Sequence, residues 1–123
     1  MTEDLKARHR ELTERLADYY RGAGYPVRFE DGLIFASGAG GVTWIGAAVT
    51  QAELDSGELE ARLPEIAERR MPEGGQLCPF ELLPDPPCAD ELRALLSRYR
   101  LDVRATVTVY KLPEAIAAEA AAA

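Results

Sequence analysis

The sequence predicts an α+β fold in which an antiparallel three-strand meander, with one or two further strands, carries helices packed on one face. Three observations indicate this class. Apolar residues recur at helical spacing in residues 5–20, an Asp-Gly pair separates two short alternating segments in residues 27–37, and alternation returns in residues 103–110. A chain of 123 residues can bury one core, so we expect a single domain over residues 1–113 and a frayed, Ala-rich tail over residues 114–123.

Apolar side chains on one face predict the first helix. Thr2 is a residue type that caps helix N-termini, and Gly22 and Gly24 are suited to the end of the helix. His9 falls on the apolar face, which predicts contact with the core or a partner rather than with bulk water. The other members of that face are Leu5, Leu12, Leu16, Tyr19 and Tyr20.

The next segments predict the antiparallel meander. Asp31-Gly32 lies between VRFE and LIFAS, and this dipeptide is the strongest short-range signal for a tight hairpin. The glycine-rich segment SGAGG predicts a second turn, and VTWIGAAV predicts a third strand because it is rich in β-branched and aromatic residues. Val27 and Phe29 should then share one face of the first strand.

The region after the meander predicts helix. Thr50 with Glu53, and Asp55 with Glu58, match the spacing of a capping box, so a helix should start within residues 50–57. Pro64 lies inside the helical pattern that follows. We therefore expect either a kink at this proline or two short helices with the proline opening the second.

Prolines dominate the next segment. Five of them in residues 72–87 surround the apolar sequence CPFELL, and because proline lacks an amide hydrogen we expect that sequence to be an edge strand or an ordered loop. A helix over residues 89–99 and a strand over residues 103–110 follow. In the strand, one face consists of Val103, Ala105, Val107 and Val109.

The composition argues against several classes of protein. The 21 acidic and 14 basic residues give a net charge of −7, which disfavours binding to nucleic acid and to anionic membranes. The chain has no apolar run of about 18 residues and no secretory signal, so we expect a cytoplasmic protein in which Cys78 and Cys88 are thiols rather than a disulfide. Arginine-rich usage without asparagine is typical of a high-GC bacterium.

Few residues could carry catalysis. His9 is the only histidine, and no cysteine lies in a metal-binding or nucleophile motif, so we expect no metal and no cofactor. Histidine titrates near neutral pH, which makes His9 the candidate general base, with Glu30 as the acid and Arg28 as the substrate anchor. The ordinary alternative is that His9 only packs and makes a hydrogen bond.

Aromatic side chains gather between the end of the first helix and the third strand, where Arg21 and Arg28 interleave with them. Aromatics beside arginine are typical of the centres of protein and peptide interfaces. Core packing accounts equally well for about half of them, because strand alternation turns every second side chain inward. The candidate ligand-binding residues in this set are Tyr20, Tyr25, Phe35 and Trp44.

Two functional hypotheses follow. The first is a small binding or accessory module, expected to be a homodimer, that holds a peptide or partner protein on its sheet face or exposed edge strand. The order helix, meander, helix over residues 1–70 is similar to that of secretion-chaperone-like domains, and this resemblance implies binding of partner segments without chemistry.

The second hypothesis is a cofactor-free enzyme that tailors a peptide natural product, with His9, Glu30 and Arg28 in the roles given above. In size the chain resembles the lysinoalanine-forming proteins of lanthipeptide biosynthesis, which implies catalysis without metal or cofactor. Whether His9 faces an open pocket or a closed core separates the two hypotheses.

Overall fold

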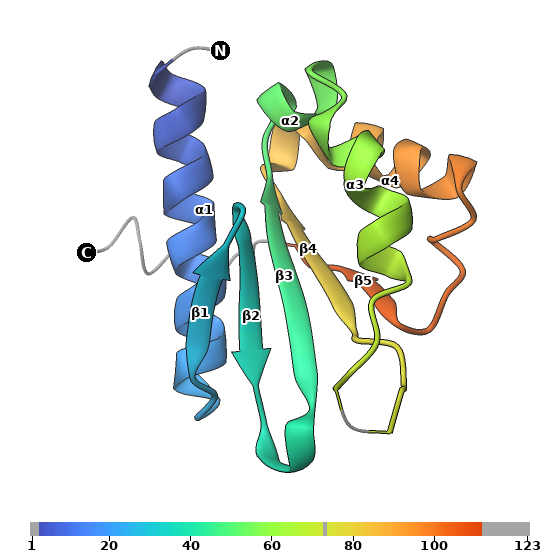
Figure 1. Cartoon of the computed structure of the whole chain (residues 1–123). Coiled ribbons are helices and arrows are strands. Elements are labelled where there is room, and N and C mark those ends of the chain that lie inside the picture. The colour runs from blue at the N-terminus through green and yellow to red at the C-terminus, as the bar shows by residue number, and fades with distance from the viewer. Residues whose placement is uncertain (1–2, 73, 112–123) are drawn as a thin grey trace.

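The computed structural model describes residues 3–72 and 74–111 (Figure 1). The expected tail over residues 114–123 lies outside this range. In chain order the elements are α1 (Glu3–Gly22), β1 (Val27–Glu30), β2 (Leu33–Ser37), the short 3-10 helix η1 (Ala39–Gly41), β3 (Thr43–Val49), α2 (Gln51–Asp55), α3 (Glu58–Ala67), β4 (Phe80–Pro84), the 3-10 helix η2 (Pro86–Cys88), α4 (Ala89–Arg98) and β5 (Val107–Val109).

The five strands form one mixed sheet in the order β1-β2-β3-β4-β5. β1, β2 and β3 pair antiparallel, whereas β4 runs parallel to both β3 and β5. The fold is therefore α+β, but the expectation of an antiparallel sheet is wrong beyond the meander. Helices connect β3 to β4 and β4 to β5, and such crossovers return the chain to the next strand in the same direction.

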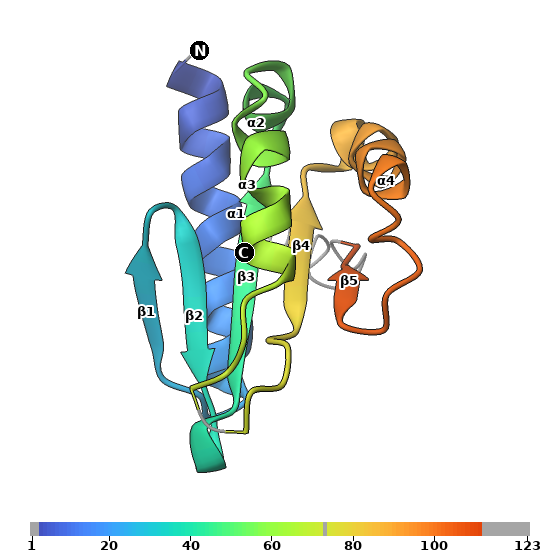
Figure 2. The same ribbon diagram turned by 45° about the vertical axis from the view of Figure 1, so that its right-hand side comes forward.

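Helices cover both faces of the sheet (Figure 2). α1 packs on one face through Leu12, Leu16 and Tyr20, while α3 and α4 pack on the other. The expectation of helices on one face is therefore wrong. The physical reason lies in the strands, because β2, β3 and β4 have buried, mostly apolar residues at successive positions and must be covered on both sides.

The sequence CPFELL provides a central strand, not the expected edge strand or loop. All five residues of β4 are buried, and the strand lies between β3 and β5. Pro79 precedes the strand and Pro84 ends it, so the residues between them keep their amide hydrogens for the sheet. The prolines therefore lie at the two ends of the strand and do not interrupt its hydrogen bonds.

Two predictions that rest on short-range sequence signals are confirmed. Asp31 and Gly32 have φ values of 52° and 77°, the left-handed pair that a two-residue hairpin requires, so the predicted hairpin is confirmed. The capping box of Thr50 and Glu53 is also confirmed. The helical break, however, lies at Gly57, whose φ is 74°, and Pro64 lies inside α3 rather than at its start.

The last expected strand is shorter than its alternating pattern. Within the expected segment, the strand that pairs with β4 is limited to Val107–Val109, and Val103 is 79% exposed. Among residues 3–72 and 74–111, none of the helices combines the length and the apolar content that a membrane crossing requires.

Candidate functional site

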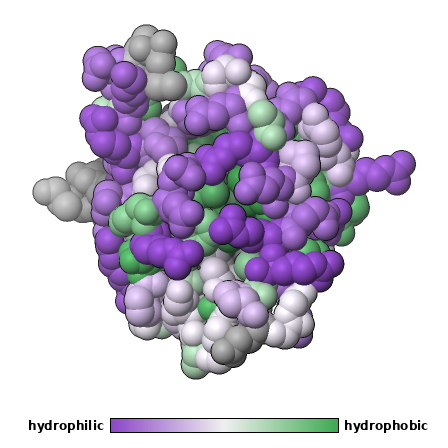
Figure 3. Space-filling view, in the orientation of Figure 1, coloured by the Kyte–Doolittle hydropathy of each residue, from purple (hydrophilic) through white to green (hydrophobic). Residues whose placement is uncertain are grey.

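A groove lies on the sheet face that carries α3, between the β1–β2 hairpin and that helix. It consists of a lower cavity of about 530 Å³ beside β2 and an upper cavity of about 290 Å³ that reaches α1. The two cavities share Asp31, Gly32, Leu33, Glu58 and Arg62, and we call them together the hairpin–α3 groove. On this face, apolar side chains are visible between charged ones (Figure 3).

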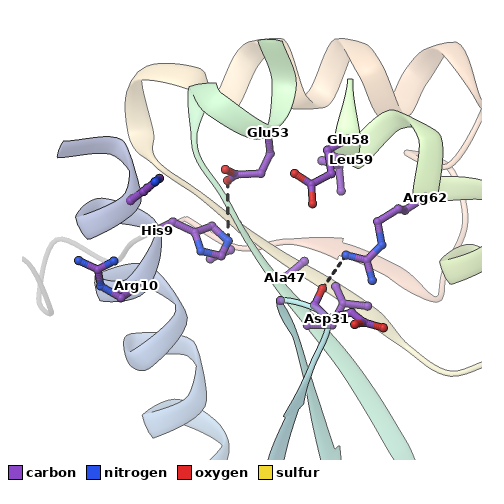
Figure 4. A pocket seen from close by; sticks show the side chains of 12 residues that line it. His9, Arg10, Asp31, Ala47, Glu53, Glu58, Leu59 and Arg62 are labelled. Atoms are coloured by element: carbon purple, nitrogen blue, oxygen red, sulfur yellow. Dashed lines mark hydrogen bonds and ion pairs between the residues drawn. The ribbon is translucent and has the colours of Figure 1, made fainter. Parts of the chain in front are cut away.

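The upper cavity is built where three helices approach the hairpin tip (Figure 4). His9 projects from α1 toward Glu53 of α2, and Glu58 and Arg62 project from α3 toward the hairpin. Leu33, Ala47, Ala48 and Leu59 supply the apolar part of its lining. The cavity thus combines an apolar base with ionisable groups of both signs.

His9 and Glu53 face each other at ion-pair distance in the upper cavity. The His9 Nε2 atom lies 3.8 Å from Glu53 Oε1, and the two side chains are 27% and 16% exposed. The same Glu53 oxygen accepts hydrogen bonds from the Thr50 backbone amide at 2.7 Å and from the Thr50 hydroxyl at 3.0 Å. The cap of α2 therefore fixes the carboxylate that faces the imidazole.

The hairpin–α3 groove has two banks, α3 on one side and the β1–β2 hairpin on the other, and Arg62 reaches from the first to the second. Its Nη1 atom donates a 2.7 Å hydrogen bond to the backbone oxygen of Asp31, which joins α3 to the hairpin tip. Within the described chain, the carboxylates of Asp31 and Glu58 form no ion pair. Two unneutralised acids thus flank one arginine at the junction of the cavities.

Phe35 lies under two arginines in the lower cavity. Its ring is 3% exposed, and the guanidinium carbons of Arg28 and Arg69 lie 4.9 Å and 5.4 Å from its centroid. Arg28 Nε is 3.7 Å from Glu30, and Arg69 Nη1 is 3.8 Å from Glu65, at the protein surface. Exposed pairs of this kind contribute about 0–1 kcal/mol, so both arginines can move away from the ring.

The three residues predicted to be catalytic do not lie together, and Arg28 lines neither cavity of the groove. His9 lines the upper cavity and Glu30 the lower one, while Arg28 lies over Phe35 and pairs with Glu30. Among the described residues, no contact joins His9 to Arg28 or Glu30. The structure thus brings Arg28 and Glu30 together and leaves His9 with Glu53.

The four residues predicted to bind a ligand do not form one surface. Tyr20, Tyr25 and Trp44 belong to the cluster on the α1 face, whereas Phe35 lies on the α3 face. Tyr20 is 2% exposed and donates a 2.6 Å hydrogen bond to Glu81. Tyr25 stacks on Trp44 with ring centroids 4.6 Å apart. Of the four, Phe35 is the one that lines the groove.

Sequence reasoning missed Glu53, Glu58 and Arg62 as site residues. The two glutamates were recognised only as parts of capping boxes, although a capping carboxylate at a helix start can also face a neighbouring helix. Arg62 follows Glu58 by four residues, so the two must share a helix face. These spacings are the sequence signals from which the three site residues could have been identified.

Both cysteines are buried thiols, as expected, and burial raises the pKa of each. Neither lines the hairpin–α3 groove. In the part of the chain that the structure describes, no group of three or more His, Cys, Asp or Glu side chains is arranged to hold a metal ion. Comparison with protein-family models, curated proteins and solved structures gives no significant match to this chain.

Proposed function

We propose that the chain is a cytoplasmic binding module that holds an extended segment of a peptide or partner protein in the hairpin–α3 groove. The observation that carries this proposal is the groove itself, two adjoining cavities with an apolar base and charged banks. An extended segment presents alternate side chains to one side, so it can place one in each cavity. The lower cavity falls within the range of about 300–1,000 Å³ typical of ligand sites.

The charges on the banks support selective binding. Along α3 and the turn that follows it, Glu58, Arg62, Glu65 and Arg69 alternate in sign, and all four line the lower cavity. Glu30 and Asp31 of the hairpin face them from the other bank. Alternating charge rewards a segment whose own charges match the pattern and penalises one in the wrong register, which gives specificity more than affinity.

The second candidate is the cofactor-free enzyme, and the His9–Glu53 pair favours it. A carboxylate held by a helix cap can orient an imidazole that takes or gives a proton in the upper cavity. In this alternative the bound segment is a substrate, and His9 rather than Glu30 supplies the acid–base group.

The test begins with selection of a displayed library of random linear peptides against the protein. Glu58→Trp places an indole at the junction of the cavities, whereas Ala61→Trp makes the same change at an exposed position on α3 that does not line the groove. We expect E58W to weaken binding of the selected peptides at least about tenfold and A61W to leave it unchanged. Equal affinity in both variants would reject the groove.

Mass spectrometry of the bound peptides separates the two candidates. A binding module returns each peptide with its mass unchanged. An enzyme returns an altered mass, and this alteration should be lost in His9→Ala while binding persists.

A further inference from the structure

The outer edge of β1 is open in the described part of the chain. β1 lies at one end of the sheet, with β2 on its inner side and no described strand beyond it (Figure 2). The Ser37 amide donates a 3.0 Å hydrogen bond to the Pro26 carbonyl, so this pair belongs to the hydrogen-bonded positions of the hairpin. Because such positions alternate in an antiparallel pair, the main-chain groups of Val27 and Phe29 face outward.

The side chains at this edge are exposed and differ between the two faces. Phe29 is 49% exposed and lies beside Arg21 of α1, whose guanidinium carbon is 5.8 Å from its ring centroid. Arg28 and Glu30 lie on the other face, with side chains 63% and 52% exposed. The strand therefore presents an aromatic ring on one face and one charge of each sign on the other.

We propose that two copies of the chain associate antiparallel through β1, with Phe29 on the two-fold axis. In this register Phe29 lies opposite Phe29 of the second copy, and their outward amides and carbonyls bond to each other. Arg28 lies opposite Glu30 of the second copy, and the symmetry repeats that pair. Aromatic and opposite-charge cross-strand pairs both stabilise an antiparallel edge.

Charge selects this register over its neighbours. Moving the axis to Arg28 places two arginines directly opposite each other, and moving it to Glu30 places two glutamates there. Directly opposed like charges destabilise a strand pair. Of these three registers, the one centred on Phe29 places each charged side chain of the strand opposite a side chain of the other sign.

A charge exchange between copies tests the proposal. In Arg28→Glu each copy carries acids at both positions, and in Glu30→Arg each carries arginines, so each variant alone opposes like charges. We expect each to self-associate at least about tenfold more weakly than the wild type. An equimolar mixture of R28E and E30R restores both opposite-charge pairs, so it should form a heterodimer of twice the 13.4 kDa chain mass.

Sedimentation equilibrium measures these masses, and circular dichroism checks that the variants fold. Arg98→Glu is the matched control, because it makes the charge change of R28E at an exposed position on α4. It should associate like the wild type. A wild type that stays monomeric up to about 1 mM, or R28E and E30R that dimerise alone, or a mixture of them that does not associate, would each overturn the proposal.

Discussion

The Tyr20 hydroxyl of α1 donates a 2.6 Å hydrogen bond to the carboxylate of Glu81, which is a buried acid in the central strand β4. The Tyr110 hydroxyl donates to the other oxygen of the same carboxylate. Gly46 of β3 lies beside this contact, and a Cβ atom there would be 2.9 Å from the Tyr20 hydroxyl. The helix, two central strands and the residue after β5 thus meet at one buried acid.

Tyr20→Phe removes one of the two hydroxyl donors to Glu81 and leaves a buried carboxylate oxygen without its partner. We expect this substitution to lower the free energy of unfolding by about 1–3 kcal/mol. Urea denaturation followed by circular dichroism measures the change. Tyr25→Phe is the control, because Tyr25 stacks on Trp44 through its ring. Loss of the Tyr25 hydroxyl should therefore lower the free energy of unfolding much less. Equal effects would show that the Glu81 contact contributes nothing specific.

Gly46→Ala tests how closely α1 approaches the sheet. The added Cβ would lie 2.9 Å from both the Leu16 Cδ2 atom and the Tyr20 hydroxyl, so these two side chains, or α1 with them, must shift. Overpacking of this kind typically costs about 1–3 kcal/mol. Gly22→Ala, where a Cβ would meet no atom within 4 Å, serves as the control. Thermal unfolding of the two variants should separate them, and coincident transitions would contradict the close approach.

Alkaline pH should destabilise the fold through the phenols of the buried Tyr20 and the half-buried Tyr110. Burial, and then the hydrogen bond to Glu81, raise the pKa of Tyr20 and of Tyr110. A pKa raised in the folded state means that folding favours the protonated phenol. Its contribution to stability is complete below the ordinary tyrosine pKa of about 10 and is lost as the pH rises above that value.

The ultraviolet absorbance of tyrosinate, followed against pH together with circular dichroism, measures this effect. Of the five tyrosines, Tyr20 and Tyr110 should ionise only as the protein unfolds. Ionisation of all five near the ordinary value while the circular dichroism stays native would contradict the buried contact.

The sequence predicted those parts of the fold that depend on neighbouring residues. The hairpin at Asp31-Gly32 needs two left-handed residues in succession, and the start of α2 needs only Thr50 and Glu53. Both signals act within a few residues, so no tertiary context is needed to recognise them.

The arrangement of β4 could not be predicted in the same way. Its parallel pairing with β3 joins Ile45 to Phe80 and depends on two helices folding back between the strands. The number of prolines suggested an interrupted segment, but Pro79 and Pro84 lie only at the two ends of the strand. The prediction that rested on their number was therefore wrong. The same limit applies to the site, since the periodicity that turned His9 inward says nothing of the Glu53 carboxylate beside it.

Thr50→Ala should affect both the fold and the upper cavity. The Thr50 hydroxyl donates to the Glu53 carboxylate and accepts a hydrogen bond from the Ala52 amide, so its loss removes the side-chain half of the cap of α2. Loss of such a cap typically costs about 0.5–2 kcal/mol. Urea denaturation measures the cost, and the NMR signals of the His9 ring should shift because the carboxylate facing it is then held by the Thr50 backbone amide alone. Unchanged ring signals would show that the cap does not position Glu53.

The most direct measurement of the central claim is an NMR titration of the isotope-labelled chain with a peptide selected from the random library. The account predicts that the largest shifts of backbone amide signals fall on the two banks of the groove, at Gly32, Leu33, Glu58 and Arg62. The same peptide should shift few signals of E58W. Shifts concentrated on α4 and β5, with the groove signals unmoved, would contradict the claim that this groove binds the partner segment.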